Sequence, residues 1–477
     1  MNRRKFLASA AAGAGAALAA VSRGSGEASP RRKPNLVFVL ADQWRAQAAG
    51  YAGDPGARTP NLDRLARQCA DFTGAVSCCP VCSPYRACLM TGRYPLTHGV
   101  FLNDVCLSTE AVSLAQALGR AGYDTGYIGK WHLDGHGRSA FIPRERRQGF
   151  QFWKALECTH NYNRSFYYGD ADARLQWEGY DAQAQTQEAC RYVREHAGGA
   201  KPFALVLSWG PPHEPYETAP EDYRKRFPAE GVALRPNVPA DRAAAARRDL
   251  AGYYAHIAAL DDCAGTLMAA LRDAGIEDDT VFVFTSDHGD MLHSHGFAKK
   301  QQPWDESVRV PLLVRYPAVL GRDGRQVDVP VNSPDIMPTL LGLAGAEIPA
   351  TVEGIDFSAL LRGTGKPDAD GALIMCPAPF GQWPRSRGGK EWRGVRTRRH
   401  TYVRDLAGPW LLYDYREDPY QERNLAADAG REALRKELDE LLAALLRRTR
   451  DEFLPARSYI DRWGYKVDDT GTVPYAP

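Results

Sequence analysis

Polar side chains that can bind a metal follow two apolar runs of the sequence. Asp42 and Gln43 come directly after one run, and Asp287 and His288 come after another. A single aspartate at such a place is more often a turn or helix-cap residue. Four potential ligands that follow two separate runs are harder to explain in this way. Because carboxylate, amide and imidazole groups are ligands of divalent cations, we predict that these four residues bind one cation rather than a structural zinc.

Further groups that can transfer protons or bind anions follow two more apolar runs. Residues 125–129 lead into Lys130 and His132, and residues 203–208 lead into His213. In an open α/β sheet, ligands bind beyond the carboxyl ends of the strands. The sequence therefore predicts one edge of a sheet that gathers two carboxylates, an amide, three imidazoles and a lysine.

A cysteine lies at the predicted start of a short helix. Ser83 is the expected N-cap, Pro84 the first helical residue and Gly92 the stop, which places Cys82 at the helix N-terminus. Free N–H groups and the positive end of the helix dipole favour an anion there. Arg86, one turn further on, adds a positive charge.

The elements that must position these residues alternate between strands and helices. Short apolar, β-rich runs predict strands at residues 35–40, 125–129, 203–208, 280–285 and 311–315, with helical patterns at residues 113–121 and 253–274. Such an alternation predicts an α/β fold with a large, mainly parallel mixed sheet between helices.

The composition changes near residues 363–371, where Gly, Pro, Lys and Asp become frequent. Beyond that point the patterns predict strands at residues 372–375, 401–404 and 410–413 and a charged helix at residues 432–450. We therefore predict a catalytic domain over residues 34–365 and a smaller C-terminal α+β subdomain over residues 372–477.

The first residues of the chain have the pattern of an export signal. Arg3 and Arg4 precede a weakly apolar stretch rich in Ala and Gly, which is typical of a twin-arginine signal over residues 1–30. The alternative, a membrane anchor, needs about 20 strongly apolar residues. We expect a periplasmic or otherwise exported protein, carried by the twin-arginine translocase.

The net charge argues against a nucleic-acid partner. Lys and Arg number 60 and Asp and Glu 58, which gives +2 over 477 residues. The basic cluster at residues 396–400 alternates with Thr, and we prefer to interpret it as a solvated strand face rather than a site for an anionic polymer. Three tryptophans can pack in the core or stack on sugars: Trp383, Trp392 and Trp410.

The segment that begins at Cys82 resembles the first signature of the sulfatase family. Cys-x-Pro-x-Arg followed by Thr-Gly is matched by Cys82, Pro84, Arg86, Thr91 and Gly92. Further matches to the family lie at residues 122–125, 129–132, 212–216, 286–289, 295–296 with Lys300, 306–311, 412–414, 418–419 and 424–425. The resemblance covers about residues 35–425 and implies an alkaline-phosphatase-like fold.

The resemblance implies that Cys82 is converted to formylglycine by a formylglycine-generating or sulfatase-maturing enzyme. The hydrated aldehyde would be the nucleophile, and it would share the cation with the four predicted ligands. Relatives often carry Asp-Asp and Asp-Asn where this chain has Asp42-Gln43 and Asp287-His288. These changes keep Ca²⁺ as the expected ion and also admit Mn²⁺.

The resemblance also implies roles for the remaining polar residues. Arg86 and Lys130 would hold the nucleophile and the sulfate, and His132 would be the base that expels sulfate. His213 and Lys300 would bind sulfate, together with Lys130, and would protonate the leaving oxygen. The expected activity is hydrolysis of sulfate monoesters, with an O-sulfated carbohydrate as substrate because an exported enzyme meets polymers and their fragments.

Three alternatives stay open from the sequence. The Gln43 and His288 variants, which occur within the superfamily, also resemble the sites of its phosphonate monoester hydrolases and phosphodiesterases, so an enzyme acting on such esters is one alternative. Cys79 and Cys82 have the spacing of a thiol redox pair, although a small thioredoxin-like βαβ context is missing. A non-catalytic carbohydrate-binding relative, in which Cys82 is never converted, is disfavoured because all the polar catalytic positions are present.

Overall fold

A computed structural model describes residues 32–367 and 369–475 of the chain. Lys33–Pro477 forms one compact unit. The predicted export signal over residues 1–30 lies outside the described residues. Among the residues that are described, no helix has both the length and the apolar character needed to cross a membrane.

The larger sheet has eight strands and confirms the predicted α/β fold. Its strand order is β10-β2-β9-β8-β1-β7-β3-β4. All neighbours pair in parallel except β9, which is antiparallel to β2 and to β8. The strands are β10 (Arg325–Asn332), β2 (Ala70–Val76), β9 (Leu312–Arg315), β8 (Thr280–Ser286), β1 (Asn35–Asp42), β7 (Phe203–Pro212), β3 (Asp124–Lys130) and β4 (Phe152–Leu156).

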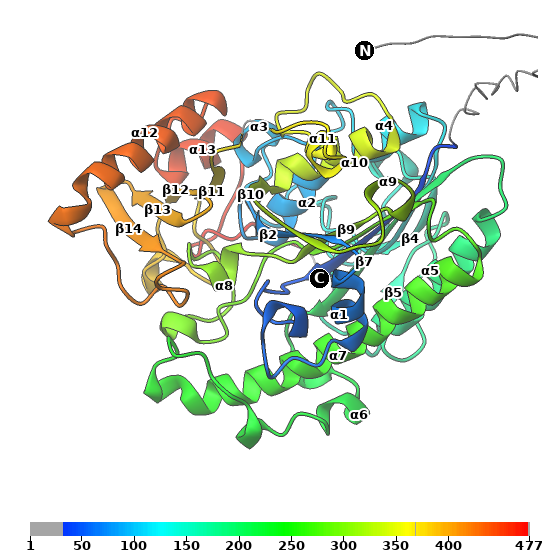
Figure 1. Cartoon of the computed structure of the whole chain (residues 1–477), viewed down its shortest axis with the longest axis horizontal. Helices are drawn as coiled ribbons and strands as arrows, with labels where there is room; N and C mark the ends of the chain where they lie inside the picture. The colour runs from blue at the N-terminus through cyan, green and yellow to red at the C-terminus, as the bar shows by residue number, and fades with distance from the viewer. Residues whose placement is uncertain (1–31, 368, 476–477) are drawn as a thin grey trace, which may run out of the picture. The chain divides into compact units, whose positions relative to one another are not determined.

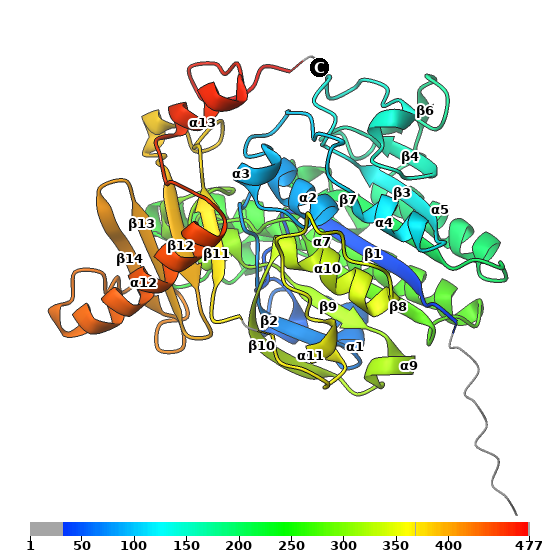
Figure 2. The same ribbon diagram turned by 90° about the horizontal axis from the view of Figure 1, so that it is seen from above.

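Helices cover both faces of this sheet, as the continuous apolar strands predict. Side chains of β1 alternate between two cores: Phe38 and Leu40 belong to one, Val37 and Val39 to the other. The first core is completed by α2 (Cys82–Thr91), α4 (Leu114–Arg120) and α10 (Ser333–Ala344), and the second by α1 (Pro60–Ala66), α5 (Asp181–His196) and α7 (Ala243–Asp273). Figures 1 and 2 show the two helical layers on opposite sides of the sheet.

The strands of the predicted core match the structure closely, whereas several edge elements were missed. The helix expected at residues 253–274 begins earlier, at Ala243, and ends at Asp273. Strands β2, β4 and β10 were not predicted. Of these, β4 and β10 are the two edges of the sheet, and β10 alternates exposed and buried residues near its start, so it lacks a continuous apolar run.

A four-stranded antiparallel sheet forms the predicted C-terminal α+β part of the chain. Its strands in order are β11 (Ala372–Cys376), β12 (Trp392–Arg396), β13 (His400–Asp405) and β14 (Gly408–Asp414). Helix α12 (Glu432–Arg448) packs on it and buries Leu438, Leu442 and Leu445 on one face. Figure 1 shows this sheet, coloured from dark yellow to orange, and the orange-red α12 at the side of the larger sheet.

Two tryptophans and one arginine of this region are buried. Trp383 and Trp392 lie in a hydrophobic cluster, so they pack in the core and are not exposed for stacking on a sugar. Arg396 was expected on a solvated face, and this expectation is wrong. Its side chain is 1% exposed, and its guanidinium forms an ion pair with Asp305 of α8 (Asp305–Val308) and a hydrogen bond to Thr401.

The Arg396–Asp305 pair should be important for stability. Arg396→Ala removes the more buried of the two cations at Asp305 and leaves only Arg309, at 3.5 Å, so we expect the free energy of unfolding to fall by about 3 kcal/mol. Arg398→Ala is a control, because Arg398 is exposed and its change should stay within about 0.5 kcal/mol. Equilibrium unfolding in urea measures both values, and equal values for the two variants would contradict the assigned role.

Candidate active site and cation site

Helix α2 places Cys82 at its first residue. The prediction that Ser83 is the N-cap is wrong. The N-cap is Val81, whose carbonyl accepts from the Tyr85 N–H at 3.1 Å. The Ser83 N–H instead donates to Asn103 Oδ1 at 3.1 Å, which anchors the first turn to a neighbouring loop. Gly92 ends the helix at φ 63, as predicted, because a glycine adopts this conformation without strain.

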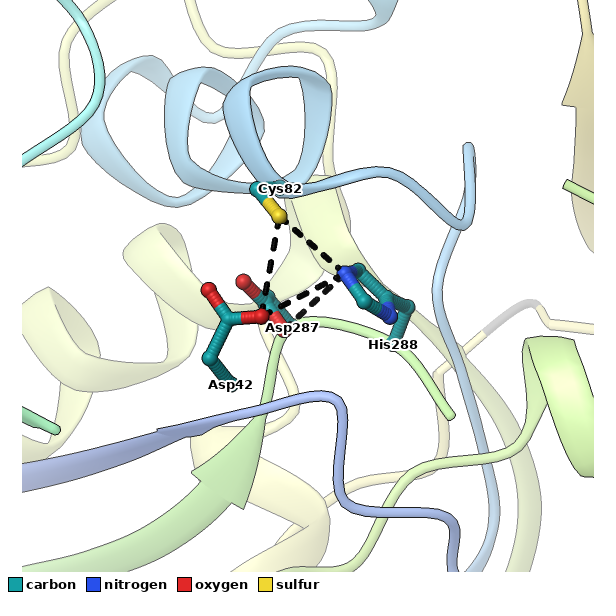
Figure 3. Close-up of side chains that lie close together, drawn as sticks. All are labelled: Asp42, Cys82, Asp287 and His288. Carbon is teal, nitrogen blue, oxygen red and sulfur yellow. Dashed lines mark hydrogen bonds and ion pairs between the residues drawn. The ribbon is translucent and has the colours of Figure 1, made fainter. Parts of the chain in front are cut away.

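Four predicted residues converge on one point. One ligand atom from each of Asp42, Cys82, Asp287 and His288 lies within 4.8 Å of the other three. Figure 3 shows Cys82 at the end of α2 directed toward the other three side chains, which come from the ends of β1 and β8. The Cys82 Sγ is 3.3 Å from His288 Nε2 and 3.6 Å from Asp42 Oδ1.

The chemistry of this donor set fits a divalent cation. The Nδ1 of His288 is 2.9 Å from the carbonyl of Gly289, to which its N–H donates, so the lone pair is on Nε2 and faces the two carboxylates. Burial lowers the pKa of His288, which keeps the ring neutral as a metal ligand must be. The position of Cys82 would present an oxygen after its conversion.

The two carboxylates of the site are buried close to one another. Burial and the Asp42 charge raise the pKa of Asp287 to about 6. Burial also acts against ionisation of Asp42, but Lys130, at 2.6 Å, and other cations hold the pKa of Asp42 well below its usual value. Arg86 donates to both carboxylates, at 3.0 and 3.1 Å. A bound cation would relieve the remaining repulsion between the two acids.

Lys300 connects three other predicted residues. Its Nζ is 3.3 Å from Cys82 Sγ, 2.9 Å from Gln43 Oε1 and 3.0 Å from His213 Nε2. The amide oxygen of Gln43 therefore lies beside the cation site, and its role as a ligand stays a prediction. Burial holds the pKa of His213 well below its usual value, which agrees with a neutral ring that accepts from Lys300.

The thiol of Cys82 has an unusual environment for a buried cysteine. Burial and Asp42 raise its pKa, but Lys130 and Lys300 lower it to about 7. Burial raises the pKa of Cys79 well above its usual value, and Cys376 and Cys78 raise it further. The two thiols thus have separate surroundings, which does not support a redox pair.

His132 is held by a carboxylate that sequence reasoning missed. Its Nε2 is 3.3 Å from Asp104 Oδ1, and Arg138 binds the same carboxylate through two hydrogen bonds of 2.8 and 2.7 Å. Burial lowers the pKa of His132, but Cys158 and Asp104 raise it to about 10, so the ring carries a proton at neutral pH. Its Nδ1 has no hydrogen-bond partner among the described residues and is left to donate to an anion.

Two more residues beside the site were missed as well. The exposed ring of His160 stacks on His213 with a centroid distance of 4.6 Å and an interplanar angle of 5°. Burial acts to raise the pKa of Cys158, but Lys130 and His132 hold it well below its usual value. Neither residue lies in a matched motif, and Cys158 follows β4, a strand that was not predicted, so the sequence carries no signal for them.

The structure thus brings together all of the predicted site residues. They are Asp42, Gln43, Cys82, Arg86, Lys130, His132, His213, Asp287, His288 and Lys300. A family profile described as sulfatase matches residues 34–346, which is well over half of the chain.

The chain belongs to the sulfatase family. A second profile, described as the C-terminal part of N-sulphoglucosamine sulphohydrolase, matches residues 293–448 of this sulfatase. The chain is 44% identical to an ulvan-active sulfatase of Formosa agariphila over 438 residues, which cover 91% of this chain and 85% of the relative. The fold, the profiles and this relative together show that the protein is a sulfatase enzyme.

Two solved structures resemble this sulfatase over nearly its whole length. One, from work on glycosaminoglycan metabolism by Bacteroides thetaiotaomicron, is 28% identical and has a TM-score of 0.81, covering 91% of this chain and 100% of the other. The other is the phosphonate monoester hydrolase of Agrobacterium radiobacter, 25% identical, with a TM-score of 0.71 and coverage of 93% and 100%.

A cation that binds this site should stabilise the folded sulfatase. For metal-stripped protein, Ca²⁺ at 100 times its Kd should raise the free energy of unfolding by about 2.7 kcal/mol, because the ion binds only the folded state. Asp287→Asn removes a hard anionic ligand and should abolish most of this gain. Asp241→Asn, at an exposed ion pair, should retain it. Thermal unfolding with and without Ca²⁺ tests this, and an undiminished gain in Asp287→Asn would refute the site.

Proposed function

We propose that this sulfatase hydrolyses O-sulfate monoesters of carbohydrates with a formylglycine formed from Cys82 and a divalent cation, preferably Ca²⁺. The observation that carries the proposal is the position of Cys82. It begins α2, faces two carboxylates and His288, and lies within 3.7 Å of the ammonium groups of Lys130 and Lys300.

The cation would be held by the four clustered side chains and by the neighbouring side-chain amide. They are Asp42, Gln43, Asp287, His288 and the modified residue 82. When present, the formylglycine hydrate supplies a nucleophile and the cation stabilises negative charge on it and on sulfate. Arg86 fixes the two carboxylates relative to α2 through its hydrogen bonds to both.

The basic residues around Cys82 suit an anionic sulfate. Lys130 and Lys300 provide fixed positive charges. Protonated His132, whose Nδ1 has no hydrogen-bond partner in the part of the chain that the structure describes, provides a further donor. Lys300 donates to His213 Nε2, so this pair can pass a proton to the leaving oxygen. For its proposed role as the base that expels sulfate, His132 must first give up its own proton.

A carbohydrate is the proposed carrier of the sulfate. Support comes from the relatives, since one is named for ulvan and one structure for glycosaminoglycan metabolism. The exposed ring of His160 on His213 offers a surface where the sugar would lie, outside the buried sulfate site. We further propose export by the twin-arginine translocase to the periplasm and conversion of Cys82 by a sulfatase-maturing enzyme.

Hydrolysis of phosphonate or phosphate diesters is the second candidate. It is favoured by the pairs Asp42-Gln43 and Asp287-His288 and by the similarity to a phosphonate monoester hydrolase. A sulfate monoester has one charge in the ground state, as a phosphodiester does, so the positive charges alone do not separate the two. Comparing the rates at which the enzyme hydrolyses a sulfate ester and a phosphodiester distinguishes the two activities.

The nucleophile can be tested chemically. Protein made in a host with a sulfatase-maturing enzyme should carry an aldehyde at position 82, whereas Cys82→Ala should carry none and should lose nearly all activity. Mass spectrometry of the peptide that contains residue 82, with and without an aldehyde-reactive hydrazide, gives the answer. A fully active enzyme with an unmodified thiol at this position would exclude the mechanism.

The substrate class can be tested with a panel of esters. Sulfated mono- and oligosaccharides should release sulfate with a higher kcat/KM than an aryl sulfate, because a sugar would contact the rim around His160 in addition to the sulfate site. An aryl phosphodiester should be turned over more slowly than either sulfate ester. Turnover of the aryl sulfate alone would overturn the carbohydrate proposal and leave sulfate hydrolysis intact, and a preference for the diester would favour the second candidate.

A further inference from the structure

The carboxamide of Gln43 contacts charged groups at both of its ends. Its Nε2 donates to Glu214 Oε2 and to Asp290 Oδ2, each at 2.7 Å. Its Oε1 accepts from Lys300 Nζ at 2.9 Å. Both hydrogens of the amide nitrogen are therefore used, and the oxygen faces Lys300, which also contacts Cys82 of the cation site.

This arrangement allows only one orientation of the amide. A carboxylate only accepts hydrogen bonds and an ammonium group only donates them. Rotating the amide by half a turn would place the oxygen of Gln43 against Glu214 and Asp290 and its N–H groups against Lys300. The two acids thus determine which atom of Gln43 faces the cation.

Asp290 is itself fixed by four donors. Its Oδ1 accepts from the backbone N–H groups of Leu292 at 2.9 Å and Lys299 at 3.0 Å. Its Oδ2 accepts from Gln43 and from the hydroxyl of Tyr216. The side chain is fully buried. One carboxylate therefore ties Gln43 to the loop that leads to Lys300.

Glu214 holds the other side of the amide. Besides Gln43, it contacts Lys299 Nζ at 2.5 Å, and it accepts from Gln382 Nε2 at 3.3 Å. It also lies 3.3 Å from Nδ1 of its neighbour His213. The backbone of Gln43 is at φ 70, a conformation that a residue with a side chain rarely adopts, so side-chain contacts must stabilise it.

We infer that Glu214 and Asp290 are positioning residues that turn the oxygen of Gln43 toward the cation and require a neutral side chain at position 43. A carboxylate there would face two other carboxylates at hydrogen-bond distance. The inference rests on the proposed cation site and does not depend on the substrate, so a failure of sulfatase activity would leave its test unaffected.

The test is the affinity of the full-length, metal-stripped protein for Ca²⁺, measured by competition with a chromophoric chelator. Gln43→Glu should weaken binding by about tenfold or more, because its added charge is repelled by both acids. Adding Glu214→Gln replaces one of the two acids with an N–H donor to the new carboxylate, so the double variant should bind Ca²⁺ about threefold or more tightly than Gln43→Glu, although Asp290 still faces the added charge. Glu221→Gln, at an exposed ion pair, is the matched control and should bind as wild type does.

Two results would overturn the inference. The first is a Gln43→Glu protein that binds Ca²⁺ as tightly as wild type, and the second is a double variant that binds no better than Gln43→Glu. If Gln43→Glu is not obtained folded, Glu214→Ala is measured instead. It leaves one N–H of Gln43 without its acceptor, so it should bind Ca²⁺ about threefold or more weakly than Glu221→Gln, and equal affinities reject the positioning role. Circular dichroism of each metal-free variant establishes that it is folded.

Discussion

The cost of burying charge is the constraint on which this structure depends. Asp42 and Asp287 are withdrawn from water next to each other, and such a pair persists only if cations and hydrogen bonds surround it. Arg86 from α2, Lys130 from the end of β3 and Lys300 from a loop after β8 provide that surrounding charge. Three segments far apart in sequence must therefore meet at one place, and the parallel strands bring them there.

The central strands and the motif residues were predictable because their signals are local. Continuous apolar runs mark β1, β3, β7 and β8, and the residues that follow each run reach the same edge of the sheet. The start of α2 was misplaced, since a Ser-Pro pair normally marks a cap, whereas here the N–H of Ser83 is taken by Asn103. Edge strands such as β10 were missed because only part of each is buried.

The supporting residues of the site could not be predicted, because their roles depend on distant partners. Asp104 reaches His132 from a loop without a metal or catalytic motif, and Asp290 lies just beyond the matched residues 286–289, where nothing local indicates that it contacts Gln43. Several site residues, including His132 at φ 59, have left-handed backbone conformations that no propensity would assign to them. The smaller sheet also takes part, since Gln382 from the segment after β11 reaches Glu214.

The burial of Cys82 limits when this residue can be modified relative to folding. Only 1% of this residue is exposed, and α2 is enclosed between the large sheet and α10. Another enzyme cannot bring its own catalytic groups to a side chain enclosed in this way. The proposed oxidation of Cys82 would therefore have to occur on the nascent or unfolded polypeptide, before α2 is enclosed between the large sheet and α10.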